Sequence, residues 1–139
     1  NILRQKIIYG IEKLTPVTKY TKRVVLFLPE AEYHELGILY VHFLLKQNGI
    51  YVDYLGTNIP MGDLEFLVSR TKPDYLFCHI TSPAKKFKLD KFLDGLSKIN
   101  KSSPVVLSGQ IVRDYKGQVA SNISIKRSLG ETIQFLNTI

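Results

Sequence analysis

The stretch that decides the fold class is Arg23-Val24-Val25-Leu26-Phe27-Leu28-Pro29. Its apolar side chains do not alternate with polar ones, so both faces of the segment are expected to be buried. A strand that is buried on both faces is typical of the centre of a parallel sheet covered by helices. The segment therefore predicts an α/β protein.

Segments of strand length alternate with segments of helical period along the rest of the chain. A strongly apolar helix is expected over 36–47, because Asn48-Gly49 is a suitable helix stop. The other expected strands are 50–55, 75–80, 104–107 and 123–125, and the other expected helices are 63–70, 90–99 and 128–136. Gly56 is expected to end the second strand, while Asp63 and Ser128 are expected to cap helices.

Parallel neighbouring strands need crossover connections, so this alternation indicates a doubly wound sheet. We expect a flavodoxin-like (Rossmann-like) five-stranded parallel sheet with strand order 2-1-3-4-5. Apolar residues at helical spacing over 2–14 predict an additional N-terminal helix, which Pro16 ends. We therefore expect the tail of a helical segment and a linker over 1–19, and an α/β domain over 20–139.

Length and composition fit one domain with its own core. The chain has 139 residues, of which 45% are hydrophobic, and a single cysteine. One cysteine forms no internal disulfide, which favours a cytoplasmic setting. No apolar run approaches the roughly 20 residues that span a bilayer, so no membrane partner is expected. The formal net charge of +7 is compatible with an acidic partner such as DNA, but a solvated lysine-rich surface is the favoured explanation.

Ligands of doubly wound sheets bind at the carboxyl ends of the strands, where the strand order reverses. Here the segments 29–37, 56–62, 79–87 and 108–113 should meet at that edge. Their polar members are Glu30, Glu32, His34, Glu35, His79, Thr81, Ser82, Ser108 and Gln110.

Several familiar ligands are disfavoured. The chain lacks the Gly-x-Gly-x-x-Gly of dinucleotide sites, the P-loop motif and the Gly-x-Ser-x-Gly of serine hydrolases. Glutamates follow the first strand, where a flavin phosphate would need neutral donors. The third strand ends in His79, where a phospho-accepting receiver domain would have Asp. No catalytic constellation is evident, so we do not expect an enzyme.

A histidine flanked by acids remains. A carboxylate near an imidazole orients the ring and raises its basicity as a metal ligand, and Glu32 lies two residues before His34. From the chemistry alone, His34 is either such a ligand or a surface histidine at the start of a helix.

The motif Glu32-x-His34-x-x-Gly37 resembles the Asp-x-His-x-x-Gly signature of cobalamin-binding domains. The resemblance implies that His34 is the lower axial ligand of cobalt and that Glu32 supports it. The family has Ser-x-Leu after its third strand and Gly-Gly after its fourth, where small residues admit the nucleotide tail of the cofactor. This chain has His79-Ile80-Thr81 and Ser108-Gly109 at those places, with Ser82 as a nearby hydroxyl. Gly56 completes the expected cofactor site.

A longer match covers about residues 20–139. The segments 28–37, 54–60 and 73–76 resemble the C-terminal cobalamin-binding domain of MerR-family transcriptional regulators. The resemblance implies a ligand-sensing domain that binds adenosylcobalamin or methylcobalamin. It also implies homo-oligomerisation and control of DNA binding by an N-terminal helix-turn-helix outside this chain. The alternatives are a corrinoid-carrier module for methyl transfer and a cofactor-free dimerisation domain of the same fold.

Overall fold

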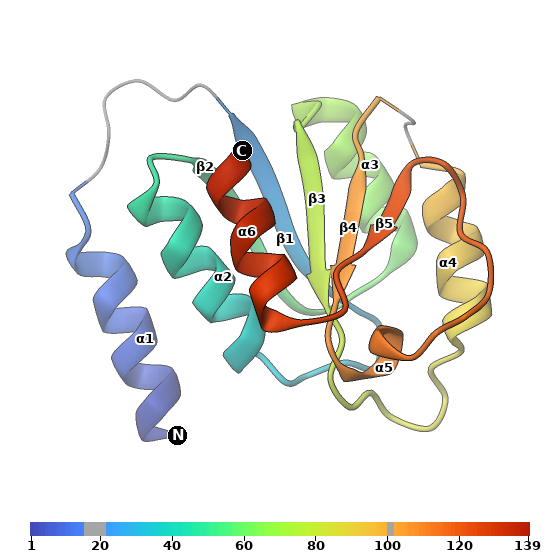
Figure 1. Cartoon of the computed structure of the whole chain (residues 1–139), viewed down its shortest axis with the longest axis horizontal. Coiled ribbons are helices and arrows are strands. Elements are labelled where there is room, and N and C mark those ends of the chain that lie inside the picture. The colour runs from blue at the N-terminus through green and yellow to red at the C-terminus, as the bar shows by residue number, and fades with distance from the viewer. Residues whose placement is uncertain (16–21, 100–101) are drawn as a thin grey trace.

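The computed structural model describes residues 1–15, 22–99 and 102–139 and shows a parallel sheet with helices on both faces (Figure 1). The five strands run in the order β2-β1-β3-β4-β5, and every described pairing is parallel. This confirms the predicted fold. The elements are α1 (Ile2–Lys13), β1 (Arg23–Pro29), α2 (Leu36–Gln47), β2 (Tyr51–Ile59), α3 (Met61–Thr71), β3 (Tyr75–His79), α4 (Leu89–Ser97), β4 (Val105–Ser108), α5 (Gln110–Arg113), β5 (Ile123–Ile125) and α6 (Leu129–Thr138).

Two cores lie on the two faces of the sheet. β1 is buried from Val24 to Pro29, as its unbroken apolar run predicts. Helices α2 and α6 cover one face, where Leu26 packs with Leu45 and Leu136. Helices α3 and α4 cover the other face. The sheet is therefore a buried central layer that can hold loops at its edges in fixed positions.

Helix α1 forms an additional layer outside α2 (Figure 1). A Cβ atom on Gly10 would lie 3.4 Å from the Phe43 ring, so the two helices approach closely. The Lys46 ammonium also donates a hydrogen bond of 2.9 Å to the carbonyl of Ile11 near the end of α1. The expected linker lies mostly at 16–21, outside the described residues. None of the helices in the described part of the chain is long and apolar enough to cross a membrane.

Three details differ from the sequence predictions. Strand β2 does not end at Gly56 but continues to Ile59. Gly56 has a left-handed backbone (φ 90°), which produces an irregularity in the pairing with β1 while the strand goes on. The cap of α3 is Pro60, and Asp63 lies in the first turn. Helix α5 was not predicted, since four residues are too few to show a helical period. Ser128 caps α6 as predicted, with its hydroxyl accepting from the Glu131 N–H.

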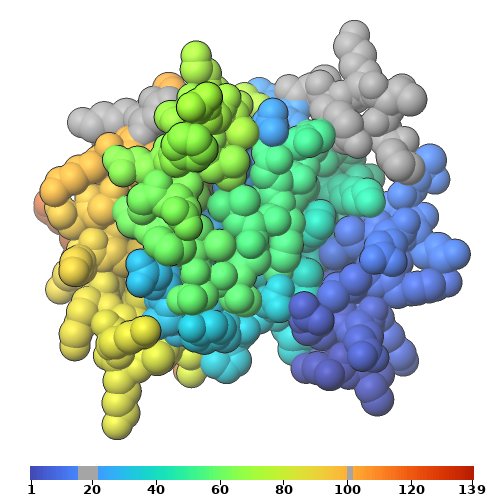
Figure 2. Space-filling view, turned by 180° about the vertical axis from the view of Figure 1, so that it is seen from behind, coloured from blue at the N-terminus to red at the C-terminus, as the bar shows by residue number. Residues whose placement is uncertain are grey.

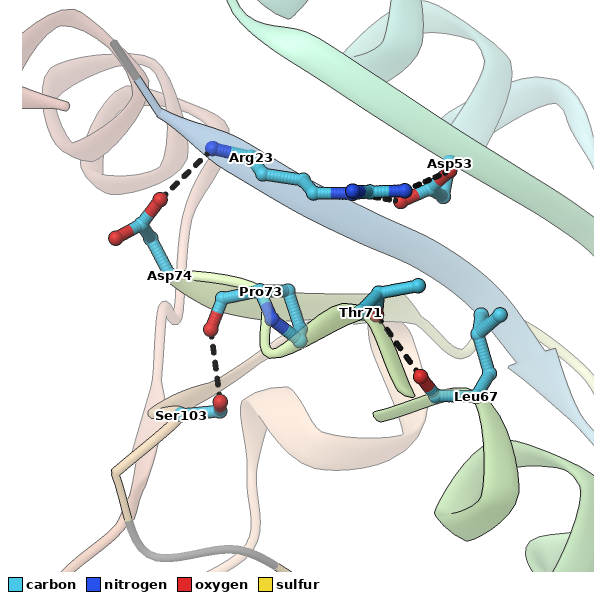
Figure 3. A network of polar contacts seen from close by, with 7 residues as sticks. All are labelled: Arg23, Asp53, Leu67, Thr71, Pro73, Asp74 and Ser103. Carbon is cyan, nitrogen blue, oxygen red and sulfur yellow. Dashed lines mark hydrogen bonds and ion pairs between the residues drawn. The ribbon is translucent and has the colours of Figure 1, made fainter. Parts of the chain in front are cut away.

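Polar contacts join the chain segments at the amino ends of the strands (Figure 3). The Arg23 guanidinium donates two hydrogen bonds to the Asp53 carboxylate, at 2.6 and 3.2 Å. The backbone N–H of Arg23 donates to Asp74, and the Ser103 hydroxyl donates to the carbonyl of Pro73. These contacts stabilise the end of the sheet opposite to the one where ligands are expected.

Candidate functional site

The loop after β1 folds back so that its glutamate points into the protein. Ala31 has a left-handed backbone (φ 75°), which few non-glycine residues adopt without support. Two hydrogen bonds hold it there: its N–H donates to the Asn58 side-chain oxygen at 2.9 Å, and its carbonyl accepts from the Ala84 N–H at 2.8 Å. Seen from behind, this loop lies at the lower edge of the molecule, between α1 and the segment that precedes α4 (Figure 2).

Glu32 is completely buried, with 0% of its surface exposed. One carboxylate oxygen, Oε1, accepts hydrogen bonds from the backbone N–H groups of Thr81 (2.6 Å) and Ser82 (3.1 Å). The other, Oε2, lies 3.3 Å from Nδ1 of His34. Backbone donors of this kind compensate a buried carboxylate for the water that it loses. Glu32 therefore joins the loop after β1 to the loop after β3 and positions His34.

His34 is directed toward solvent, with 60% of its side chain exposed. Its Nδ1 faces Glu32, and among the described residues its Nε2 has no hydrogen-bond partner. Fixing one ring nitrogen against a carboxylate leaves the other free to bind a metal. The geometry thus presents Nε2 of His34 at the carboxyl edge of the sheet.

His79 lies between α2 and β4. A Cβ atom on Gly37 would lie 2.3 Å from Cδ2 and 2.5 Å from Nε2 of the His79 ring, so the ring rests directly on the first turn of α2. On its other side, Nδ1 lies 2.8 Å from the Ser108 hydroxyl. Burial lowers the pKa of His79, and the charge of Glu32 opposes that shift. The ring is therefore neutral near pH 7 and spans the gap between the two elements.

A cavity of about 380 Å³ begins beside His79, and we call it the α2–α6 cavity. Helix α2 runs antiparallel to the strands, and its residues from Gly37 to Leu44 line the cavity. At roughly 1.5 Å per residue, the cavity therefore extends about 10 Å inward from the edge of the sheet. The lining includes three cations and no carboxylate, so the cavity favours a neutral or anionic group. The lining residues are Gly37, Tyr40, Val41, Leu44, His79, Thr81, Ser108, Gly109, Gln110, Arg113, Lys126, Arg127, Ser128, Leu129, Thr132 and Ile133.

The other predicted site residues have different positions. A Cβ on Gly109 (φ 104°) would meet the Ile80 carbonyl at 2.3 Å, so close approach of two backbones explains this glycine. Gly56 is buried in the β2 irregularity and does not line the α2–α6 cavity. Thr81 lines this cavity and also a shallower one of about 440 Å³, which Ser82 lines as well. Ser82 thus contributes its N–H to Glu32, and no contact of its hydroxyl with the α2–α6 cavity is seen.

The sequence placed Glu35 at this edge, but it did not identify the partners that hold the loop, which are Arg4, Tyr54 and Asn58. Glu35 accepts a hydrogen bond of 2.5 Å from the Tyr54 hydroxyl and pairs with Arg4 at 3.0 Å. Asn58 supports Ala31, as described above. No local pattern identifies them, because each partner comes from a distant segment of the chain.

Protein side chains alone do not form a complete metal site here. Within residues 1–15, 22–99 and 102–139, no group of three or more His, Cys, Asp or Glu could hold a metal ion. A single histidine suits an ion that brings its other ligands with it.

No protein-family model matches this chain, and no curated protein does either. Solved structures do match. One is described as a novel cobalamin-binding protein from Desulfitobacterium hafniense DCB-2, with a TM-score of 0.61 and 14% identity over 84% of this chain and 58% of that one. This chain shares its fold with that cobalamin-binding protein.

Two further structures come from Methanosarcina barkeri. The methanol:cobalamin methyltransferase complex MtaBC matches with a TM-score of 0.61 and 20% identity, over 98% of this chain and 54% of that one. The monomethylamine corrinoid protein matches with a TM-score of 0.59 and 14% identity, over 99% of this chain and 64% of that one. This chain therefore spans between 54% and 64% of the length of these three proteins.

Proposed function

We propose that this chain binds a corrinoid and that Nε2 of His34 is an axial ligand of its cobalt. The observation that carries the proposal is the buried Glu32 carboxylate, which faces Nδ1 of His34 while Nε2 stays open to solvent. A corrin supplies four equatorial nitrogens, so one protein ligand completes a face of the metal. The fold shared with proteins described as binding cobalamin or corrinoids supports the same conclusion.

The residues around His34 fit such a ligand. Glu32 holds the imidazole in one orientation and makes Nε2 a better donor to the metal. The amide-rich rim of a corrin finds polar groups at the same edge of the sheet, among them Thr81, Ser82 and Gln110. Arg113 and Lys126 in the α2–α6 cavity give this side of the site a positive charge that suits a phosphate group.

Corrinoid carriage in methyl transfer is the role that the solved structures favour. One of them is a methanol:cobalamin methyltransferase complex, and another is described as a corrinoid protein. In this role the chain holds methylcobalamin or a related corrinoid, and the bond-breaking chemistry belongs to a partner enzyme. The chain by itself is then a carrier and not a catalyst.

The second candidate is the sensory domain of a MerR-type regulator. Helix α1 supports it, because Ile2, Leu3 and Tyr9 are 72%, 55% and 61% exposed on a helix that already packs on α2. Such a helix suits continuation into a helical segment of a longer protein. Binding of adenosylcobalamin or methylcobalamin would then shift oligomerisation, and with it DNA binding by a helix-turn-helix elsewhere in that protein.

Electron paramagnetic resonance tests the ligand directly. The protein is loaded with aquocobinamide, which lacks a lower base, and reduced to Co(II). A nitrogen ligand splits each cobalt line into a triplet, and in cobinamide that nitrogen must come from the protein. We expect the triplet in the native protein and its loss in His34→Ala.

The matched control is His42→Gln. His42 lies midway along α2, and its ring stacks on Tyr54 with the ring centroids 5.2 Å apart, so it is held away from the ligand position and the triplet should persist. A triplet that survives in His34→Ala would show that another residue is the ligand. Failure of the folded native protein to retain any corrinoid would refute the proposed function.

Light scattering separates the two roles. A regulator changes its oligomeric state when it binds the corrinoid, whereas a carrier keeps the same mass with and without it. An unchanged mass would count against the sensory role.

A further inference from the structure

We propose that His79 determines which corrinoids the site accepts, favouring those that lack a bulky lower nucleotide over complete cobalamin. This inference rests on the proposed function and concerns the same site. It assigns to His79 a role in selecting the ligand, distinct from the role of His34 in binding cobalt.

The chemistry of cobalamin sets the requirement. A nucleotide arm hangs from the lower face of the corrin and ends in a benzimidazole base that binds cobalt. If His34 takes that position, the base must leave the metal, and the whole arm must find space on the protein side. Cobinamide lacks the phosphate, ribose and base, so it makes no such demand.

The α2–α6 cavity is where the arm would have to go. It begins at Gly37, three residues after His34, and runs inward between the helices and the sheet. Its cations suit the phosphate of the arm, and the apolar side chains of Val41 and Leu44 suit the base. Cavity size and lining therefore do not exclude the arm.

His79 closes the entrance between α2 and β4. Its ring touches the backbone of α2 at Gly37, where no side-chain atom would fit, and its Nδ1 reaches the Ser108 hydroxyl at 2.8 Å. The ring thus extends from one wall to the other at the end nearest His34. An arm that enters here must displace the ring and break this hydrogen bond in a partly buried place.

This displacement weakens only the binding of corrinoids that carry the arm. Breaking a hydrogen bond and leaving a partly buried hydroxyl without a partner corresponds to a loss of affinity on the order of 10- to 100-fold. Cobinamide binds at the exposed edge and leaves the ring in place. The native protein should therefore bind aquocobinamide more tightly than aquocobalamin by at least that factor, because release of the base from cobalt also weakens aquocobalamin binding.

Absorbance titrations with aquocobinamide and aquocobalamin test the inference on three proteins. The native protein should show the preference, and His79→Ala should narrow it about 10- to 100-fold by raising affinity for aquocobalamin, with affinity for aquocobinamide changed by less than about twofold. His79→Gln keeps a long side chain that can bond to Ser108, so it should retain the preference. Circular dichroism checks that each variant is folded.

A second readout identifies the nitrogen on cobalt. Protein with isotopically labelled histidine changes the splitting of the Co(II) spectrum only if the ligand comes from the protein. We expect this change with aquocobinamide in the native protein. With aquocobalamin we expect it in His79→Ala at concentrations at which the native protein is still unloaded.

Equal affinity of the native protein for both corrinoids, with histidine on cobalt in both, would overturn the role of His79, although His34 would remain a ligand. A preference that is unchanged in folded His79→Ala would also overturn it. No binding of either corrinoid to any folded variant would instead refute the proposed function, and the inference with it.

Discussion

Replacing Glu32 tests how the loop after β1 is held, independently of any ligand. In Glu32→Ala the completely buried carboxylate is lost, and the N–H groups of Thr81 and Ser82 lose the acceptor that it provides. An unsatisfied buried donor costs about 1–3 kcal/mol, and the two costs are not fully additive, so we expect a loss of about 3 kcal/mol. That is a large part of a typical total stability of about 5–15 kcal/mol.

Glu32→Gln separates hydrogen bonding from charge. Its amide oxygen can still accept from both N–H groups, so only the added strength of a charged acceptor is lost, about 1–2 kcal/mol. Glu30→Ala is the matched control, because Glu30 is exposed in the same loop and its removal should change stability by less than about 0.5 kcal/mol.

Urea denaturation measures these differences. Far-UV circular dichroism and tyrosine fluorescence are the probes, since the chain has eight tyrosines and no tryptophan. In thermal melts, a loss of about 3 kcal/mol at this chain length lowers Tm by about 6–12 °C. A Glu32→Ala variant as stable as the Glu30→Ala control, or a Glu32→Gln variant as unstable as Glu32→Ala, would refute this role of the Glu32 carboxylate.

Three further predictions follow from buried groups and close contacts. Gly37→Ala should lower the free energy of unfolding by about 1–3 kcal/mol, because the new methyl group pushes the His79 ring aside. In a denaturant double-mutant cycle, Gly37→Ala/His79→Ala should lose less stability than the sum of the two single changes. Additive losses would mean that the two residues do not touch. Burial, aided by the charge of Lys46, lowers the pKa of His42 to about 4. As the pH falls below 6.5, the unfolded state therefore binds a proton before the folded state does. The free energy of unfolding should be at its full value above pH 6.5 and fall by about 1–2 kcal/mol toward pH 4, after a discount for partial exposure. Urea midpoints across that range should show a smaller decline in His42→Phe, and an identical decline would contradict this origin. Burial raises the pKa of the Cys78 thiol, so a disulfide reagent should label it only after urea unfolds the protein, and rapid labelling of the native protein would contradict its burial.

Predictions from sequence were most accurate where the physics is local. The run 23–29 is buried as its missing alternation predicts, and α2 has the predicted bounds with Asn48 as its cap. The cap of α3 and the end of β2 were wrong, because a left-handed residue at Gly56 continues the strand where a turn was expected. Local patterns do not distinguish an irregular strand from its end.

The candidate site shows the same division. Sequence and resemblance identified Glu32, His34 and Gly37, which lie within six residues of one another. Neither identified Asn58 or Tyr54 as supports of the loop, because those contacts depend on how β2 lies beside β1.

The sequence by itself determined the α/β class, the strand order and the edge at which the polar loops meet. Those properties follow from periodicity, crossover handedness and the rule that parallel strands end together. Only the tertiary structure decided that Glu32 is buried against the N–H groups of Thr81 and Ser82, 49 and 50 residues away. It also decided that the His79 ring lies between Gly37 and Ser108, and Ser108 is 29 residues after His79 in the chain. Contacts at such separations depend on where side chains point after the layers pack, and that information is absent from any single segment.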